Sequence, residues 1–130
     1  MSMVADTDVL IDYLNARAPW AARIALEIEH GGLATTVITR FELLVGARSP
    51  KQQKAIQTLL DAVPALPLDM TSADRAAEVR RTLEKQGNPI GMGDSLIAGI
   101  VLANHGVLLT RNTKHFGRVP GLRLSGRAEE

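Results

Sequence analysis

The strongest constraint on the fold is an alternation along the chain between short apolar runs and longer segments of helical periodicity. This alternation is typical of α/β layer folds, in which helices connect and cover the strands of one sheet. The pattern predicts five short strands, at residues 3–5, 33–38, 65–68, 107–110 and 122–124. It predicts six helices, at residues 9–14, 21–30, 39–47, 51–62, 72–86 and 92–105. We therefore expect an α/β fold around a mostly parallel sheet.

The composition is that of an ordinary compact protein. The 130 residues, 45% of them hydrophobic, suit a single domain over residues 1–130. A formal charge of +1 provides no overall field that would attract nucleic acid or a membrane surface. The absence of cysteine excludes disulfides, thiolate nucleophiles and sulfur-bound zinc, and permits a reducing compartment. With no signal peptide and no apolar stretch near the roughly 20 residues that span a bilayer, we expect a cytoplasmic protein without a membrane partner.

Two long helical segments differ in their expected exposure. Residues 72–86 carry opposite charges at helical spacing, such as Arg80 and Glu84, so this helix should face solvent. Residues 92–105 have apolar side chains around most of the helix circumference, so this helix should be buried almost all round. Gly106 is expected to end it in the left-handed conformation.

Polar side chains recur where a predicted strand ends or a predicted helix begins. They are Asp6, Glu42, Asp94 and Asn112. In a parallel α/β sheet these points share one edge, so the four side chains should converge in one crevice. Carboxylates gathered there would repel one another unless a cation neutralised them. Oxygen ligands favour Mg²⁺, with Mn²⁺ as the alternative, and such ions assist attack by water on phosphate esters.

Each acid also has a purely structural explanation. Asp8 and Asp94 suit the first turn of a helix, where a negative charge complements the helix dipole. Glu42 follows Thr39 at the spacing of a capping box. Asp6 is harder to explain in this way, because it ends an apolar strand and has no evident cap to make. It is the joint placement of the acids that favours a functional site.

The three histidines give less support to catalysis. His30 and His105 lie at predicted helix ends, where a cation suits the helix dipole, so we assign them structural roles. His115 lies beside the expected crevice and is a candidate for contact with substrate. No Ser/His/Asp arrangement is evident, which disfavours a nucleophilic triad.

Four segments together resemble the PIN-domain ribonucleases, and among them the VapC toxins of bacterial type II toxin–antitoxin systems. They are "VADTDVLIDYL", "TTVITRFELLVGA", "GDSLIAGIVLANHG" and "LLTRNTKHF", in an order that covers nearly the whole chain. The resemblance implies a three-layer α/β/α fold and Mg²⁺-dependent endonucleolytic cleavage of RNA. It also implies a homodimer, and inhibition by a VapB-type antitoxin that binds near the active site in a hetero-oligomer.

Matched by position, the resemblance makes Asp6, Glu42 and Asp94 the catalytic, metal-binding acids. Asn112 stands at a fourth catalytic position that is commonly acidic. Its amide oxygen could bind a metal ion or a water ligand, but it adds no charge, which weakens the prediction of a second ion. Supporting or substrate-binding roles are expected for Thr7, Asp8, Thr39, Thr110, Arg111 and Lys114. The threonines would orient the acids, Asp8 would give peripheral support, and the two cations would contact backbone phosphates.

Two other functions compete with this interpretation. A phosphatase of the haloacid dehalogenase type is suggested by "DTD" after a strand and by a later "GDS". It would require an apolar strand directly before Asp94 and a second acid where Ala98 stands, and the sequence has neither. The other alternative is a non-catalytic PIN-fold binding module, which Asn112 alone supports.

Overall fold

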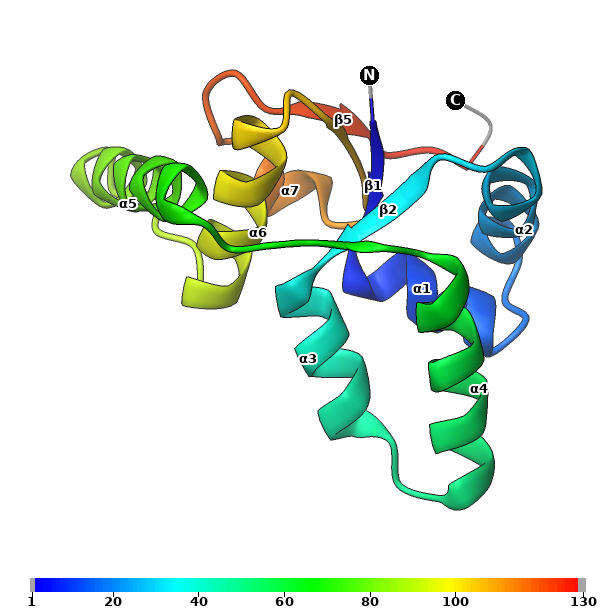
Figure 1. The fold of residues 1–130 in the computed structure, drawn as a ribbon. Helices are drawn as coiled ribbons and strands as arrows, with labels where there is room; N and C mark the ends of the chain where they lie inside the picture. The colour runs from blue at the N-terminus through cyan, green and yellow to red at the C-terminus, as the bar shows by residue number, and fades with distance from the viewer. Residues whose placement is uncertain (1, 129–130) are drawn as a thin grey trace.

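The computed structural model describes residues 2–128. Five parallel strands form one sheet in the order β3-β2-β1-β4-β5 (Figure 1). The strands are β1 (Met3–Ala5), β2 (Leu33–Thr36), β3 (Ala65–Leu66), β4 (Val107–Leu109) and β5 (Arg123–Ser125). The helices are α1 (Thr7–Leu14), α2 (Trp20–His30), α3 (Val37–Gly46), α4 (Pro50–Ala62), α5 (Met70–Lys85), α6 (Met92–Ala103) and α7 (Thr113–Phe116). The predicted α/β fold with five strands is confirmed, and the sheet is entirely parallel.

Helices cover both faces of the sheet, which gives the three-layer α/β/α arrangement (Figure 1). Successive strand residues point to opposite faces, so Val4 and Ala5 belong to different apolar cores. Ala5 packs with buried side chains of α1, α2 and α4, while Val4 packs with those of α5 and α6. Leu108 and Leu109 of β4 divide between the two cores in the same way.

The expected exposure of the two long helices is confirmed. The side chains of Ile97, Ile100 and Val101 in α6 are buried, because α6 lies between the sheet and α5 (Figure 1). On the outer face of α5, Arg80 Nε lies 3.4 Å from Glu84 Oε1 in an exposed ion pair. Within residues 2–128, no helix combines the length and the apolar character needed to cross a bilayer.

Most errors in the predicted boundaries come from helix caps. The strand predicted at residues 33–38 stops at Thr36, because the hydroxyl of Thr36 accepts a hydrogen bond from Thr39 N at 3.1 Å and starts α3 at Val37. The capping box expected for Thr39 and Glu42 is therefore wrong. Asp69 likewise caps α5 and starts it at Met70, two residues earlier than predicted. The short helix α7 was not predicted at all.

The prediction that Gly106 ends α6 in the left-handed conformation is wrong. The left-handed residue after α6 is His105, with φ of 53°, while Gly106 has no positive φ. A Cβ atom on Gly106 would lie 3.1 Å from the carbonyl oxygen of Ser2 and from Cγ2 of Val4. Glycine is thus favoured here by close packing against β1 rather than by its conformation.

The close packing of α6 on α5 can be tested by a substitution at Gly99. A Cβ atom there would lie 2.5 Å from Ser72 O and 2.6 Å from Ala76 N and Cβ. Because these atoms belong to or touch the backbone of α5, Gly99→Ala should lower the free energy of unfolding by about 1–3 kcal/mol. Gly46→Ala, at a helical glycine with no neighbouring atom within 4 Å, is the matched control and should melt at or above the parent temperature. Equal thermal melting of the two variants would contradict the close packing.

Candidate active site

The carboxyl ends of β1, β2 and β4 lie side by side, because β1 pairs with both of the other strands in parallel. Asp6 follows β1 directly, and Thr110 follows β4. α3 begins after β2, and its Glu42 approaches the start of α6: a Cβ atom on Gly93 would lie 3.9 Å from Glu42 Oε2. The acids expected to converge therefore do lie at one edge of the sheet.

Asp6 is the most buried of these acids, with 6% of its surface exposed. Oδ1 accepts a hydrogen bond from Thr7 N at 2.8 Å, so Asp6 is the N-cap of α1, contrary to our expectation that it had no cap to make. Oδ2 accepts a hydrogen bond from Thr110 Oγ1 at 2.7 Å. Burial, and next the charge of Asp8, raise the pKa of Asp6 to about 7, although the bonds from Thr110 and Thr7 oppose this shift.

Glu42 lies in α3 and is oriented by threonine hydroxyls. Thr7 Oγ1 lies 2.7 Å from Glu42 Oε1 and 3.0 Å from Thr39 Oγ1. Because a hydroxyl has one proton, Thr7 donates to Glu42 and accepts from Thr39. Thr39 is fully buried, so this short chain fixes one carboxylate oxygen of an otherwise exposed side chain. These are the contacts that an orienting role for Thr7 and Thr39 requires.

Asp94 lies in the first turn of α6, and His115 of α7 approaches it. His115 Nδ1 is 3.7 Å from Asp94 Oδ2. Burial raises the pKa of Asp94, the charges of Glu42 and Asp8 add to this, and His115 opposes it. Asp94 is therefore surrounded by the other acids of this edge, with the imidazole of His115 beside it.

Asn112 caps α7 instead of facing the acids. Its Oδ1 accepts a hydrogen bond from His115 N at 3.4 Å, and its Nδ2 lies 3.3 Å from His115 Nδ1. Its own backbone N–H donates to Thr110 Oγ1 at 2.9 Å. The amide of Asn112 thus positions His115 beside Asp94, and its expected role as a ligand stays a prediction.

Asp8 makes contacts beyond those expected of a residue at the start of a helix. It does lie in the first turn of α1, as expected, but its Oδ2 accepts a hydrogen bond from Arg111 N at 3.0 Å across the site. Thr110 Oγ1 lies 3.4 Å from the same oxygen. Burial raises the pKa of Asp8, and its bond from the backbone of Arg111 is the main opposing contact.

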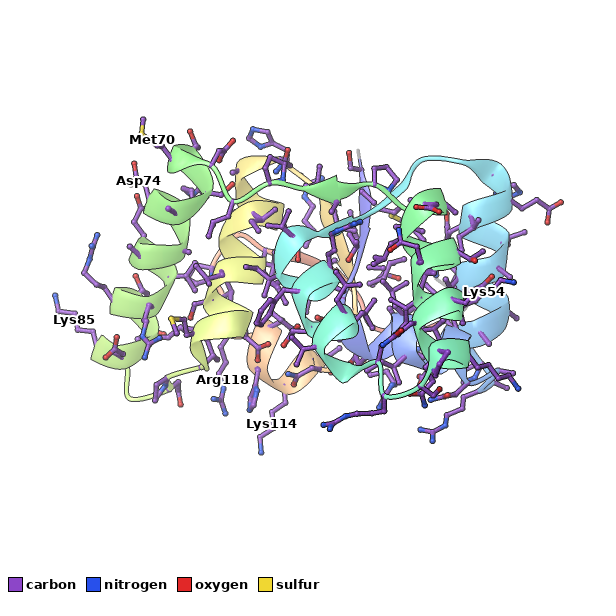
Figure 2. The ribbon with its side chains drawn as sticks, turned by 60° about the horizontal axis from the view of Figure 1, so that its bottom comes forward. Lys54, Met70, Asp74, Lys85, Lys114 and Arg118 are labelled. Atoms are coloured by element: carbon purple, nitrogen blue, oxygen red, sulfur yellow. The ribbon has the colours of Figure 1, made fainter. Side chains whose placement is uncertain are left out.

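Two cations border the site. Arg111 Nε lies 2.8 Å from Asp12 Oδ2, and the guanidinium is half exposed while Asp12 is buried. Lys114 is exposed on α7 and extends toward the end of the molecule at which α6 begins (Figure 2). We did not predict the contribution of Asp12. Asp12 lies four residues after Asp8, which places both acids on the same side of α1. This spacing is the feature of the sequence that could have identified Asp12.

The donor atoms at this edge suit a hydrated divalent ion. The acids offer only oxygen, and Asp8 Oδ1 is buried without a hydrogen-bond partner among residues 2–128. Within the same residues, no three acidic or histidine side chains lie close enough together to hold one ion directly. Mg²⁺ commonly keeps several water ligands and needs only one or two carboxylates in direct contact. The site therefore fits Mg²⁺ with water between some of the acids and the ion.

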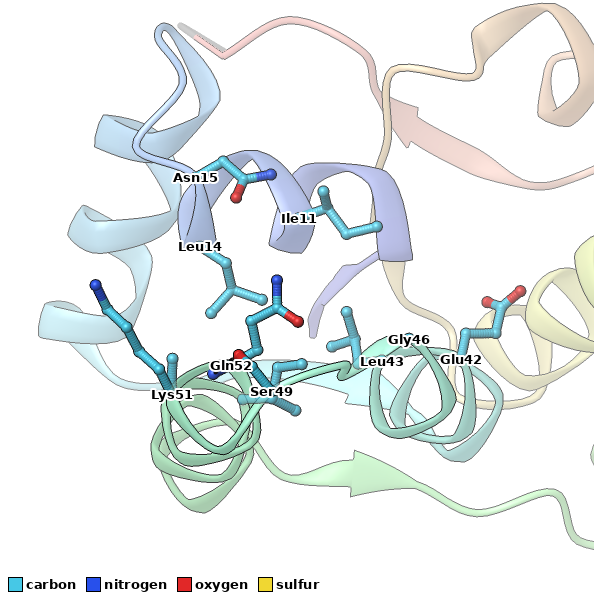
Figure 3. A pocket seen from close by; sticks show the side chains of 11 residues that line it. Ile11, Leu14, Asn15, Glu42, Leu43, Gly46, Ser49, Lys51 and Gln52 are labelled. Carbon is cyan, nitrogen blue, oxygen red and sulfur yellow. Dashed lines mark hydrogen bonds between the residues drawn. The ribbon is translucent and has the colours of Figure 1, made fainter.

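An open groove of about 520 Å³ adjoins the site between α1, α3 and α4. Its lining residues are Ile11, Leu14, Asn15, Glu42, Leu43, Gly46, Ser49, Lys51, Gln52, Ala55 and Ile56. Figure 3 shows Glu42 at one end of the groove, with its carboxylate directed toward α6. A ligand in the groove would thus reach one acid of the site.

The three-layer parallel fold with an acidic carboxyl edge agrees with a family model described as PIN domain, which matches residues 3–122. The chain therefore belongs to the PIN-domain family. The tRNA(fMet)-specific endonuclease VapC of Shigella flexneri is 28% identical over 95% of this chain and 96% of its own length. Ribonuclease VapC1 of Haemophilus influenzae strain R2866 is 32% identical over 94% and 95%. The VapBC-1 structure from nontypeable Haemophilus influenzae is 30% identical, covers 100% of both chains and has a TM-score of 0.84. VapC proteins are thus among the relatives of this chain in the family.

The raised pKa of Asp6 predicts a pH dependence of stability without metal. Its folded pKa of about 7 lies above the value of 3.8 for a free side chain. The contribution of protonated Asp6 to the free energy of unfolding is therefore complete below about pH 4, and it is lost as pH rises through 7. Asp6→Asn keeps a capping oxygen and removes this loss. Asp6→Asn should therefore gain stability relative to the parent as pH rises. Measured in the presence of a chelator, the difference in unfolding free energy (variant minus parent) should increase by roughly 2–4 kcal/mol between pH 4 and pH 8.

Asp61→Asn is the matched control, since it removes an exposed carboxylate on α4 away from the site. Its melting temperature should follow that of the parent at every pH. A difference between Asp6→Asn and the parent that stays constant with pH would contradict the raised pKa.

Proposed function

We propose that this chain is a cytoplasmic, Mg²⁺-dependent endoribonuclease and acts as the toxin of a VapBC pair. The observation that carries the proposal is the convergence of Asp6, Glu42 and Asp94 at one edge of the sheet, with two of the three pKa values raised. The family supports the activity, because the Shigella flexneri relative is named an endonuclease and the Haemophilus influenzae relative a ribonuclease.

Asp6, Glu42 and Asp94 would hold the ion, with Mn²⁺ as an alternative to Mg²⁺. When bound, such an ion supplies positive charge near a phosphodiester and makes a nearby water a stronger nucleophile for in-line attack. The protein's own contribution is orientation. Thr110 holds one oxygen of Asp6, and Thr7 holds one oxygen of Glu42, so each carboxylate has a fixed direction before substrate arrives.

The cations at the border would hold the RNA backbone. Asp12 fixes the guanidinium of Arg111 near the end of β4 while leaving it half exposed for a phosphate. Lys114 would add a second phosphate contact from α7. His115 lies close enough to Asp94 to reach a substrate bound between them. These contacts would position RNA without selecting its sequence.

The competing functions have less support. A haloacid dehalogenase-type enzyme needs a strand just before its late acidic motif, yet residues 86–91 form a turn and a loop before α6. A non-catalytic binding module is favoured by Asn112, which adds no charge to the site. It predicts a chain that binds RNA or a partner protein but leaves RNA intact when Mg²⁺ or Mn²⁺ is present.

The groove between α1, α3 and α4 is our proposed contact for a VapB-type antitoxin. It is apolar over most of its length and ends at Glu42, so a segment lying in it would cover part of the site. A homodimer is the second assembly that we propose. Phe41 and Val45 on α3 are 65% and 61% exposed, and a second copy would remove this apolar surface from water.

Asp6→Asn should reduce RNA cleavage by about a hundredfold or more, because it removes one charged ligand while keeping the cap of α1. Cleavage of a fluorescent RNA should require added Mg²⁺ or Mn²⁺ and stop with chelator. Asp61→Asn should cleave at the parent rate. Cleavage by the parent that resists chelation would contradict the metal dependence, and full activity of Asp6→Asn would contradict the site.

Ala55→Arg tests the groove. Ala55 is an exposed lining residue on α4, so a long charged side chain should fill the groove without disturbing a core. We expect affinity for the cognate VapB-type chain to fall about tenfold or more, with unchanged RNA cleavage by the free protein. Gln57→Arg, exposed on the same helix outside the groove, should bind like the parent. Equal affinity of all three proteins would place the antitoxin elsewhere.

A further inference from the structure

Arg23 in α2 is a buried cation that the proposed chemistry does not use. Only 8% of its surface is exposed, and its guanidinium makes contacts in two directions. Nε lies 2.9 Å from Glu27 Oε2, one turn later in the same helix. Nη1 donates to the backbone oxygens of Ala128 at 3.1 Å and of Arg127 at 3.4 Å. Arg23 thus ties α2 to the last described residues of the chain.

The place of Arg23 in α2 does not itself call for a charge. Trp20 and Ile24 of the same helix belong to the apolar core beneath it. A buried ion pair is often no more stabilising than apolar side chains of similar volume. A planar guanidinium, however, can bond a carboxylate on one side and carbonyl oxygens on the other, which an apolar side chain cannot do. Holding the chain near its end is therefore the distinctive task of this arginine.

The segment bound in this way, residues 125–128, is called the C-terminal strap below. It follows β5, an edge strand that pairs only with β4 among the described residues. Ser125 O accepts a hydrogen bond from Thr110 N at 3.2 Å. A Cβ atom on Gly126 would overlap Cγ2 of Thr113, so the strap also lies directly against the start of α7. From there the chain leads toward α2 (Figure 1).

Thr110 connects the C-terminal strap to the acids. Its N–H is bound by the strap, and its Oγ1 donates to Asp6 Oδ2 at 2.7 Å and accepts from Asn112 N at 2.9 Å. The position of this hydroxyl depends on the backbone at Thr110. Because β5 is hydrogen-bonded on one side alone, a strap without its anchor would allow the bond between Ser125 and Thr110 to open locally.

We propose that Arg23 is a positioning residue of the acidic edge. By anchoring the C-terminal strap on α2, it fixes Thr110 and, through the hydroxyl of Thr110, the direction of the Asp6 carboxylate. The contacts that carry this inference do not depend on the activity, but its effect on RNA cleavage rests on the proposed function.

Amide hydrogen exchange of the full chain, measured by NMR, tests the anchor without reference to activity. In Arg23→Met the N–H of Thr110 should exchange about tenfold faster than in the parent. The N–H of Thr35, which donates to Pro64 O at 2.9 Å away from the strap, is the internal reference and should keep its parent rate. Arg23→Lys keeps the charge without the planar fork and should show a smaller change of the same sign. Glu27→Gln leaves both bonds to the strap and should exchange like the parent.

RNA cleavage gives the second measurement. Arg23→Met should lower kcat about threefold to tenfold with little change in KM, because a slightly misdirected carboxylate weakens the chemical step more than binding. Thr110→Val removes the hydroxyl that links the strap to Asp6. In that background Arg23→Met should change kcat by less than about twofold, since the two residues act through one path.

Three results would overturn the inference. They are an unchanged exchange rate at Thr110 in Arg23→Met, an equal acceleration at Thr35, which marks general destabilisation, and an equal fall in kcat with and without the Thr110 hydroxyl. If the parent does not cleave RNA, the proposed function fails, and hydrogen exchange alone decides whether Arg23 positions this edge.

Discussion

Repulsion among like charges at the carboxyl edge of the sheet is the constraint on which the site depends. Burial raises the pKa values of Asp6, Asp8 and Asp94, and the charges of neighbouring acids add to the shift at Asp6 and Asp94. The side chains that hold Asp6 and Glu42 in place are the hydroxyls of Thr110 and Thr7, which carry no charge. A neutral donor fixes the direction of a carboxylate but does not cancel its field beyond that bond. The protein thus keeps its acids oriented without cancelling most of their charge, which is the arrangement that the proposed cation would require.

The register of the central strands decides which groups meet at this edge. β1 lies between β2 and β4, with Ala5 opposite Leu109, and Asp6 N donates to Leu109 O at 2.9 Å. This pairing places Asp6 directly beside Thr110. A shift of one residue would turn the alternating side chains of β1 to the opposite faces and exchange its two apolar cores. The packing of Val4 and Ala5 against separate helix layers therefore also fixes the geometry of the acids.

The layers could be predicted from the sequence because apolar periodicity reports burial directly. The errors arose where one polar side chain ends a strand and starts a helix. Residues 35–39 are β-branched throughout, which favours a strand, yet the cap made by Thr36 starts α3 at Val37. α7 has only four residues, too few for a periodic signal. The pairing of Asp12 with Arg111 joins residues 99 positions apart, so only the fold brings it about.

For Asp6, a helix cap and a place in the site are not rival roles. Oδ1 caps α1 while Oδ2 faces Thr110, so one carboxylate starts a helix and contributes charge to the site. The positive end of the α1 dipole favours an ionised acid at this position and so offsets part of the repulsion from Asp8. Asn112 likewise has two roles, because its amide caps α7 and holds His115 beside Asp94. Because aspartate and asparagine cap helices about equally well, the choice between them is left to the electrostatics of the site. At the cap of α1, residue 6, that choice is a charge, and at the cap of α7, residue 112, it is an amide.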